Sequence, residues 1–157
     1  MTPLIHRTGM AGFVIACACL LAAPSGNAGD PPGPDDKPFA EAHIVLQLSD
    51  GDEAVQARVL NVASNLLKHY GGPDLVDLEI VAFGPGISLL FADSTQRERI
   101  SSLAANGVRF VACMNTVETI ERNSGKRPEL NPLAIPVQTG VAHIVQRSTE
   151  GFVVVRP

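Results

Sequence analysis

Cys113 is the residue in this sequence whose type and position are best suited to chemistry. It ends an apolar stretch over 108–113, predicted to be a strand, and lies directly before a predicted helix over 115–122. Asn115 is a favourable N-cap for that helix, and Glu118 follows three residues later at the capping-box position. The unpaired N–H groups and the dipole at a helix N-terminus favour an anion. A thiolate at Cys113 would therefore be stabilised and more reactive.

A purely structural role for Cys113 is the alternative interpretation. Free cysteine is among the most buried residue types and often behaves as a small apolar side chain. Arg109 would share a strand face with Cys113 but lie about 13 Å away, so it is a poor direct activator of the thiol. The residues alone leave both interpretations open.

Apolar runs of strand length alternate with segments of helical periodicity from residue 42 onward. Strands are expected at 44–48, 78–83, 108–113 and 152–155, with a further short strand at 134–137, and helices at 53–70, 95–107, 115–122 and 139–146, with one helical turn at 87–91. Asp50 and Glu53 are a plausible capping pair for the first helix. This alternation predicts an α/β fold, a three-layer sandwich with a mainly parallel five-stranded sheet in flavodoxin-like order.

The carboxyl ends of these strands are the expected location of a site, because ligands of open parallel sheets bind there. Cys113 lies at one such end, and the segment Gly84-Pro85-Gly86 follows another. Asp50 follows the first strand, so three segments distant in sequence are expected to converge. The glycine-proline-glycine segment either forms a tight turn or allows close approach of a ligand or a neighbouring subunit.

The first 28 residues match a secretory signal peptide. A short segment with Arg7 and no acidic residue precedes an unbroken run of apolar and small residues over 10–23. Gly26 and Ala28 fit the small-residue positions of a cleavage site, so cleavage is expected after Ala28. A permanent membrane span is not expected, because the apolar run is shorter than the roughly 20 residues that cross a bilayer.

The predicted organisation is a signal peptide over 1–28, a linker over 29–41 and one domain over 42–157. The linker is rich in Pro, Gly and Asp and is expected to be flexible or extended, with a partner-binding arm as the alternative. We therefore expect a periplasmic or secreted protein. The segment before Cys17 also resembles a lipoprotein box, so a lipid anchor on Cys17 is the competing expectation.

Composition excludes several classes of partner. Aromatic residues make up 4% of the chain and Trp is absent, which disfavours stacking on single-stranded nucleic acid. The formal charge of −4 disfavours non-specific binding to DNA or anionic membranes. Cleavage would remove Cys17 and Cys19 and leave Cys113 as the single cysteine. In an oxidising compartment such a thiol is buried, paired between chains or chemically used.

No cofactor or metal is expected from the sequence. His43, His69 and His143 are too scattered to form a metal-ligand motif, and Cys113 has no cysteine partner at zinc-site spacing. Gly125-Lys126 lacks the remaining residues of a phosphate-binding loop. The basic residues near it, Arg122, Lys126 and Arg127, are expected in a solvated loop, with steering of an anionic substrate as the alternative.

The stretch Gly107-Val108-Arg109-Phe110-Val111-Ala112-Cys113-Met114-Asn115-Thr116 resembles the central motif of DsrE/DsrF-like proteins. The strand over 80–83 that runs into residues 84–86 and the ending over 151–157 are similar to the same family. The resemblance spans roughly 42–157 and implies a DsrE-like fold. The better-known relatives, the DsrEFH and TusBCD sulfur-relay proteins, carry persulfide sulfur on a cysteine after the corresponding strand, within oligomers.

This resemblance implies that Cys113 accepts and relays sulfane sulfur as a persulfide, as a sulfurtransferase-like carrier with a sulfur donor or acceptor protein as partner. The binding residues it implies are Asn115, Thr116, Gly84, Pro85 and Gly86. It also implies a homo-oligomer, a trimer or hexamer. Whether the chain is an enzyme stays open, because the alternative is a non-enzymatic oligomeric module for ligand binding or assembly. In that module Cys113 is structural.

Overall fold

The computed structural model describes Met1 and residues 37–157. The predicted signal peptide after Met1, with its Cys17, and most of the predicted linker lie outside the described residues. Lys37 belongs to the linker segment that is described, and its Nζ donates hydrogen bonds to the carbonyls of Val76 (3.1 Å) and Gly107 (3.0 Å). Among the described residues, no helix has the length and apolar character needed to cross a membrane.

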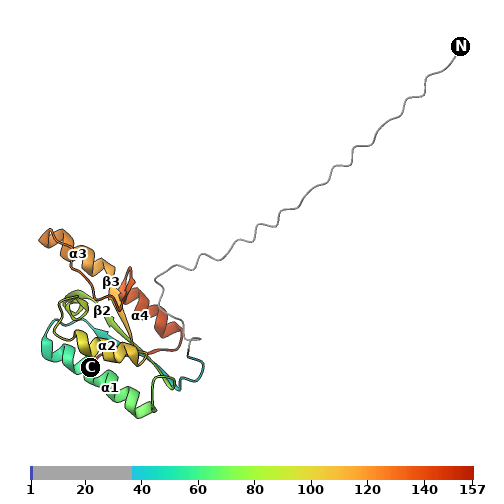
Figure 1. The fold of residues 1–157 in the computed structure, drawn as a ribbon, viewed down its shortest axis with the longest axis vertical. Coiled ribbons are helices and arrows are strands. Elements are labelled where there is room, and N and C mark those ends of the chain that lie inside the picture. The colour runs from blue at the N-terminus through green and yellow to red at the C-terminus, as the bar shows by residue number, and fades with distance from the viewer. Residues whose placement is uncertain (2–36) are drawn as a thin grey trace.

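Five parallel strands form a single sheet in the order β4-β3-β2-β1-β5, and helices cover both faces (Figure 1). The strands are β1 (Ala42–Leu48), β2 (Val76–Ala82), β3 (Arg109–Cys113), β4 (Ala134–Val137) and β5 (Val153–Val155), and the helices are α1 (Glu53–Tyr70), the 3₁₀ helix η2 (Gly84–Leu90), α2 (Arg97–Ala105), α3 (Met114–Ser124) and α4 (Gly140–Thr149). This architecture confirms the predicted α/β sandwich with flavodoxin-like topology.

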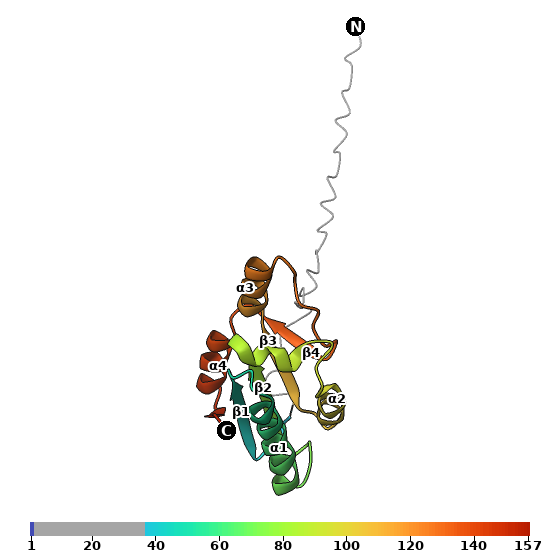
Figure 2. The same ribbon diagram turned by 90° about the vertical axis from the view of Figure 1, so that its left-hand side faces the viewer.

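The two faces of the sheet are covered unequally. The connections from β1 to β4 each step to the next strand in one direction, and their helices pack on one face. The connection through α4 returns across the sheet and places β5 beside β1. In Figure 2, α4 lies to one side of the strands and α2 to the other. The larger core lies under α1, η2, α2 and α3, whereas the α4 face has a small cluster of Val45, Val81, Val111, Ile144 and Phe152.

Strand β2 alternates between these two cores and carries charge into one of them. Leu78, Ile80 and Ala82 belong to the larger core. Asp77 precedes Leu78 and Glu79 lies between Leu78 and Ile80, so both point toward the opposite, α4 face, and both are fully buried. Parallel strands covered on both faces are normally almost wholly apolar, so buried carboxylates here require partners on the α4 side.

Most predicted elements are present, with ends that differ by a few residues. The short strand predicted at 134–137 is confirmed as β4, and η2 replaces the single helical turn predicted at 87–91. The predicted capping pair of Asp50 with Glu53 is wrong. Asp52 directly precedes α1, and its Oδ1 accepts hydrogen bonds from the N–H groups of Ala54 (2.9 Å) and Val55 (3.1 Å).

Candidate functional site

Cys113 is the last residue of β3 and the N-cap residue of α3, and it is a free, buried cysteine with 5% of its surface exposed. The prediction that Asn115 caps this helix is wrong. The chain is still extended at Cys113 and becomes helical at Met114, which places Asn115 within the first turn. The predicted junction between a strand and a helix at the thiol is therefore present, and the helix begins one residue earlier than predicted.

The N-terminus of a second helix also meets Cys113. Gly140 begins α4, and a Cβ placed on Gly140 would lie 3.0 Å from the Cβ of Cys113. Neither α3 nor α4 has a side-chain cap on its first N–H groups among the described contacts. The N-terminal ends of both helices carry partial positive charge, and both helices begin beside Cys113.

The turn over residues 138–140 is tied to the first turn of α3 by a small polar network. Asn115 donates its backbone N–H to the Gln138 carbonyl (3.0 Å) and its side-chain amide to Thr139 Oγ1 (2.9 Å). Gln138 Nε2 donates to Asn115 Oδ1 (2.7 Å) and to Glu118 Oε1 (3.2 Å). The Sγ of Cys113 lies 3.9 Å from the Gln138 carbonyl oxygen, so this turn also covers the thiol.

The segment over 84–86 lies at the same edge of the sheet and contacts α3. Gly84 donates its N–H to Thr116 Oγ1 (3.0 Å), which brings these two predicted site residues together. Gly84 has a left-handed φ of 52°, and a Cβ on Gly86 would lie 2.6 Å from the carbonyl oxygen of Leu48. The close approach at Gly86 is therefore made by the backbone of β1.

The third predicted segment also reaches this edge. A Cβ on Gly51 would lie 3.1 Å from the Pro85 carbonyl oxygen, which places the loop after β1 against the segment over 84–86. The Oδ1 of Asp50 accepts a hydrogen bond from the N–H of Asp52 at 2.9 Å, so Asp50 shapes that loop. The three segments expected to converge at the carboxyl ends of the strands do so.

A buried charged cluster lies beneath α4, and its members come from segments far apart in the sequence. We call Asp77, Glu79, Arg109, His143 and Arg147 the Glu79 cluster. Glu79 Oε1 accepts from Arg109 Nε (3.0 Å) and pairs with Arg147 Nη2 (2.9 Å), and its Oε2 lies 2.8 Å from His143 Nε2. Arg109 also pairs with Asp77 through Nη2 and Oδ1 at 2.7 Å. Glu79 thus connects β2, β3 and α4.

The ionisation of this cluster follows from its contacts. Burial alone would raise the pKa of Glu79, but the hydrogen bond with His143 and the charges of Arg109 and Arg147 outweigh burial and hold that pKa below its ordinary value. Burial disfavours the charged Arg147 guanidinium, yet its bonds to Glu150 and Glu79 leave its pKa raised. The hydrogen bond from Arg147 lowers the pKa of Glu150. Glu79 and Arg147 are therefore a charged pair in the folded protein.

Several residues of this region were not identified from the sequence. Glu79 interrupts an apolar strand, and that interruption was the available signal for a buried ionic partner. His143, considered from the sequence only among histidines too scattered to bind a metal, is buried and bonded to Glu79. Gln138 and Gly140 carried no local signal, because their contacts with α3 and Cys113 join segments more than 20 residues apart.

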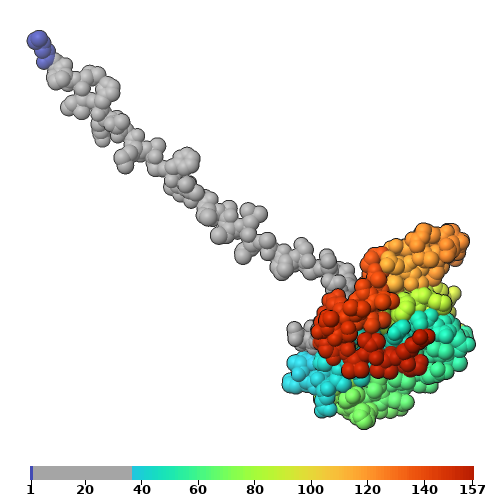
Figure 3. Space-filling model, turned by 180° about the vertical axis from the view of Figure 1, so that it is seen from behind, coloured from blue at the N-terminus to red at the C-terminus, as the bar shows by residue number. Residues whose placement is uncertain are grey.

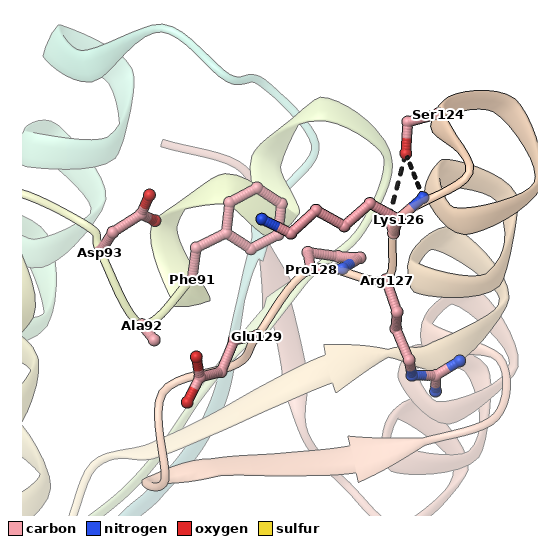
Figure 4. Close-up of a pocket in the computed structure, with 8 residues that line it drawn as sticks. All are labelled: Phe91, Ala92, Asp93, Ser124, Lys126, Arg127, Pro128 and Glu129. Carbon is pink, nitrogen blue, oxygen red and sulfur yellow. Dashed lines mark hydrogen bonds between the residues drawn. The ribbon is translucent and has the colours of Figure 1, made fainter.

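A surface cavity of about 650 Å³ lies at the opposite end of α3 from Cys113. It is lined by Phe91, Ala92, Asp93, Ser124, Lys126, Arg127, Pro128 and Glu129 (Figure 4). Arg127 pairs with Glu121 at 2.7 Å, with both side chains about half exposed. Lys126 and Arg127 are exposed in the loop after α3, as the expected solvated loop requires. Since α3 is roughly 16 Å long, this loop lies remote from the thiol, which disfavours the alternative of steering an anionic substrate to it.

Within Met1 and residues 37–157, no group of three or more His, Cys, Asp and Glu side chains is arranged to hold a metal ion. No known family model matches the chain. No curated protein sequence matches it either.

A solved structure does match. MTH1491 from Methanobacterium thermoautotrophicum, a protein of unknown function, superimposes with a TM-score of 0.66 and is 33% identical in sequence. The match covers 74% of this chain and 100% of MTH1491, so the whole of that protein corresponds to a large part of this one. The α/β sandwich described above is thus shared between the two. The chain belongs to the same protein family as MTH1491.

Proposed function

We propose that this protein is an exported member of the DsrE/DsrF-like family and that Cys113 accepts and relays sulfane sulfur as a persulfide. The sequence resemblance over 107–116 supports the family. The observation that carries the chemistry is the meeting of two helix N-termini, those of α3 and α4, at the Cys113 side chain. Helix N-termini carry partial positive charge and are sites where proteins commonly place reactive cysteines, which supports this role for Cys113.

The proposed reaction is a thiol–disulfide-type exchange and needs no metal. The Cys113 thiolate attacks the terminal sulfur of a donor persulfide, a new S–S bond forms on Cys113, and the donor S–S bond breaks. The electron pair of that bond leaves with the donor, which departs as a thiolate. Thiosulfate reacts in the same way, with sulfite as the leaving group. A second thiolate then removes the sulfur and regenerates Cys113.

The neighbouring residues have positioning roles in this proposal. Asn115 holds the turn over 138–140 against α3 through its bonds to Gln138 and Thr139. Thr116 fixes the loop at Gly84. Together they keep the starts of both helices beside Cys113, while Pro85 and Gly86 shape the adjoining loop.

Intact-mass measurement tests this function. The Cys17→Ser/Cys19→Ser protein, with Cys113 as its single thiol, is incubated with thiosulfate or polysulfide and weighed. We expect a gain of about 32 Da, one sulfur atom, that cyanide or a thiol removes. The matched control adds Cys113→Ser and should gain nothing. No gain with any of several donors, or an equal gain in the control, would contradict the proposal.

A second candidate function is an oligomeric module for ligand binding or assembly, with Cys113 structural. It is favoured by the burial of Cys113 and by exposed valines on α4 and β5. Val141 and Val145 on α4 are 52% and 57% exposed, and Val153 on β5 is 62% exposed. Figure 3 shows α4 and the C-terminal segment on one face of the molecule. An apolar edge strand is normally paired or covered, and a second copy of this chain suits an uncharged patch.

Homo-oligomerisation, as a trimer or hexamer, is compatible with both candidate functions. Light scattering on the purified protein would give its mass in solution. The two functions are separated by the thiol: the module predicts that the folded protein resists persulfidation and that Cys113→Ser leaves its assembly unchanged. Rapid persulfidation of Cys113 would contradict the second candidate function, in which Cys113 is structural.

Export to the periplasm or beyond the cell is also part of the proposal. The mass of the protein recovered from its native cells would test it. A product beginning at Gly29 supports cleavage after Ala28. A product beginning at a lipid-modified Cys17 supports the lipoprotein alternative, and an unprocessed chain contradicts export with cleavage.

A further inference from the structure

Helix α4 is attached to the sheet chiefly by polar contacts. Its buried residues are Gly140, His143, Ile144 and Arg147, of which only Ile144 has an apolar side chain. By comparison, α1 buries Val59, Leu60 and Ala63 in the larger core. Elements with few buried apolar contacts open at lower free energy than the rest of a fold. The attachment of α4 to the sheet therefore depends on the side chains that His143 and Arg147 contact.

Glu79 is the partner that these two residues share. Its Oε1 pairs with Arg147 Nη2 at 2.9 Å, and its Oε2 lies 2.8 Å from His143 Nε2. Both helix residues lie one to two turns after Gly140, so a single carboxylate on β2 holds the first two turns of α4 against the sheet. Removing one partner of a buried ionic network leaves the other charges uncompensated, which is costly.

The start of α4 is also what covers Cys113. Gly140 packs on the Cys113 Cβ, and the preceding Gln138 carbonyl lies 3.9 Å from its Sγ. With 5% of its surface exposed, Cys113 meets a reagent in solution chiefly when this segment moves. The bonds that tie Gln138 to α3 are at the surface, where water readily replaces them, whereas the bonds to Glu79 are buried.

We propose that Glu79 controls access to Cys113 by holding α4 closed over the thiol, and that α4 opens while the rest of the sheet stays folded. The inference rests on the proposed function, because a covered thiol exchanges sulfur with a donor only while it is uncovered. Glu79 is a positioning residue in this scheme. It acts on Cys113 through α4 and does not contact the sulfur.

The alkylation rate of Cys113 by iodoacetamide measures this access directly. In the Cys17→Ser/Cys19→Ser background, Glu79→Gln should raise the rate by about tenfold or more at fixed pH, because the open population grows as the anchor weakens. Asp77→Asn is the matched control. It removes a buried carboxylate from the same face of the same strand, but its ion pairs are with Arg109 on β3 and His43 on β1. We expect that control to change the rate by about twofold or less.

Global unfolding must be separated from opening of α4. Urea denaturation of each variant gives its unfolding equilibrium constant, and the alkylation rate of Glu79→Gln should rise by more than that constant does. Hydrogen exchange followed by mass spectrometry should show faster exchange in the peptide over 140–149 and little change in α1. The proposal is wrong if the alkylation rate follows the unfolding equilibrium constant equally in Glu79→Gln and Asp77→Asn. It is also wrong if the amide hydrogens of α1 and α4 exchange at the same rate.

A second variant keeps the test valid if Glu79→Gln does not fold. His143→Gln weakens the same anchor from the helix side and leaves the carboxylate paired with Arg109 and Arg147. It should raise alkylation in the same direction, and an unchanged rate counts against the anchor. Alkylation needs no sulfur donor. If the variants change alkylation as expected but Cys113 takes up no sulfur, the proposed function alone is rejected. If Cys113 takes up sulfur but the variants leave alkylation unchanged, control of access by Glu79 alone is rejected.

Discussion

Gly140 and Cys113 lie in contact across the junction of α4 and β3: a Cβ on Gly140 would approach the Cβ of Cys113 to 3.0 Å. That separation is tighter than ordinary van der Waals contact between side chains. The same Cβ would lie 3.5 Å from Phe83 Cβ and 3.5 Å from Val81 Cγ1. The absence of a side chain at residue 140 therefore lets the N-terminus of α4 reach the thiol.

Gly140→Ala should lift the start of α4 from the sheet. Alanine favours a helix over glycine by up to about 1 kcal/mol, so propensity alone predicts stabilisation. We expect the contact with Cys113 to prevail, since overpacking of a buried site costs roughly 1–3 kcal/mol. The variant should melt several degrees lower and react faster with iodoacetamide. Val141→Ala, on the exposed side of α4, is the control, and a stabilised Gly140→Ala protein would refute this packing.

Gly86→Ala should be strongly destabilising for a different reason. Its Cβ would lie 2.6 Å from the Leu48 carbonyl oxygen and 2.9 Å from the Leu48 carbonyl carbon, both backbone atoms of β1. Backbone cannot rotate away, so the loop over 84–86 must shift, at a cost of about 2–3 kcal/mol or more. Urea denaturation checks this. Gly51→Ala, where the nearest atom is the Pro85 carbonyl oxygen at 3.1 Å, should cost clearly less.

The pH dependence of stability should reveal the charged state of Glu79. Its folded-state pKa lies below the ordinary value of 4.5, because the bond with His143 and two arginine charges outweigh burial. The stability it contributes is thus complete above about pH 4.5 and is lost as the pH falls through the folded-state pKa. We expect the wild-type unfolding free energy to fall as the pH drops below about 4.5.

Glu79→Gln should flatten that acid dependence and lower the unfolding free energy at pH 7 by about 3 kcal/mol, since it breaks a buried ionic network. Urea titrations at several pH values measure both effects. Glu150→Gln is the comparison: the pKa of Glu150 is lowered in the same direction by Arg147, but the side chain is at the surface. An acid dependence that survives unchanged in Glu79→Gln would show that other carboxylates cause it.

The exposed valines of α4 and β5 should mark the contact between copies of the chain. Val145→Glu and Val153→Lys each place a charge on a side chain that is more than half exposed in the single chain. Neither change disturbs a buried contact, so the circular dichroism spectrum should be retained. Light scattering should show a smaller assembly for both. If the wild-type protein is monomeric, or if both variants keep the wild-type mass, this face is not the interface.

The order of strands and helices could be predicted from the sequence because the two kinds of element differ in the period of their apolar residues. That period placed Cys113 at a strand end and brought Gly84, Cys113 and Asp50 to one edge. It did not place α4 over Cys113, because the return of the chain across the sheet depends on packing between distant elements and leaves no pattern in the local sequence. Nor did it distinguish Asp52 from Asp50 as a cap, since both side chains are good hydrogen-bond acceptors and the two residues are only two positions apart.

The buried ionic cluster was hidden for a related reason. Glu79 and Arg109 lie on neighbouring strands, and His143 lies on a helix that passes over both, 64 residues after Glu79 in sequence. A charged residue within an apolar strand indicates that a partner exists, but the partner is identified only when the sheet order is known. Strand order, in turn, depends on packing between elements and not on any single segment.

The order of the strands in the sheet has a consequence for how the domain folds. Each of the strands β1 to β4 lies beside the strand that precedes or follows it in sequence, whereas β5 pairs with β1, from the other end of the domain. Contacts between residues distant in sequence form late, since closing the longer loop costs more entropy. We therefore expect α4 and β5 to dock last. The Cys113 thiol would then be open to oxidants and to other unfinished chains until the final step of folding covers it.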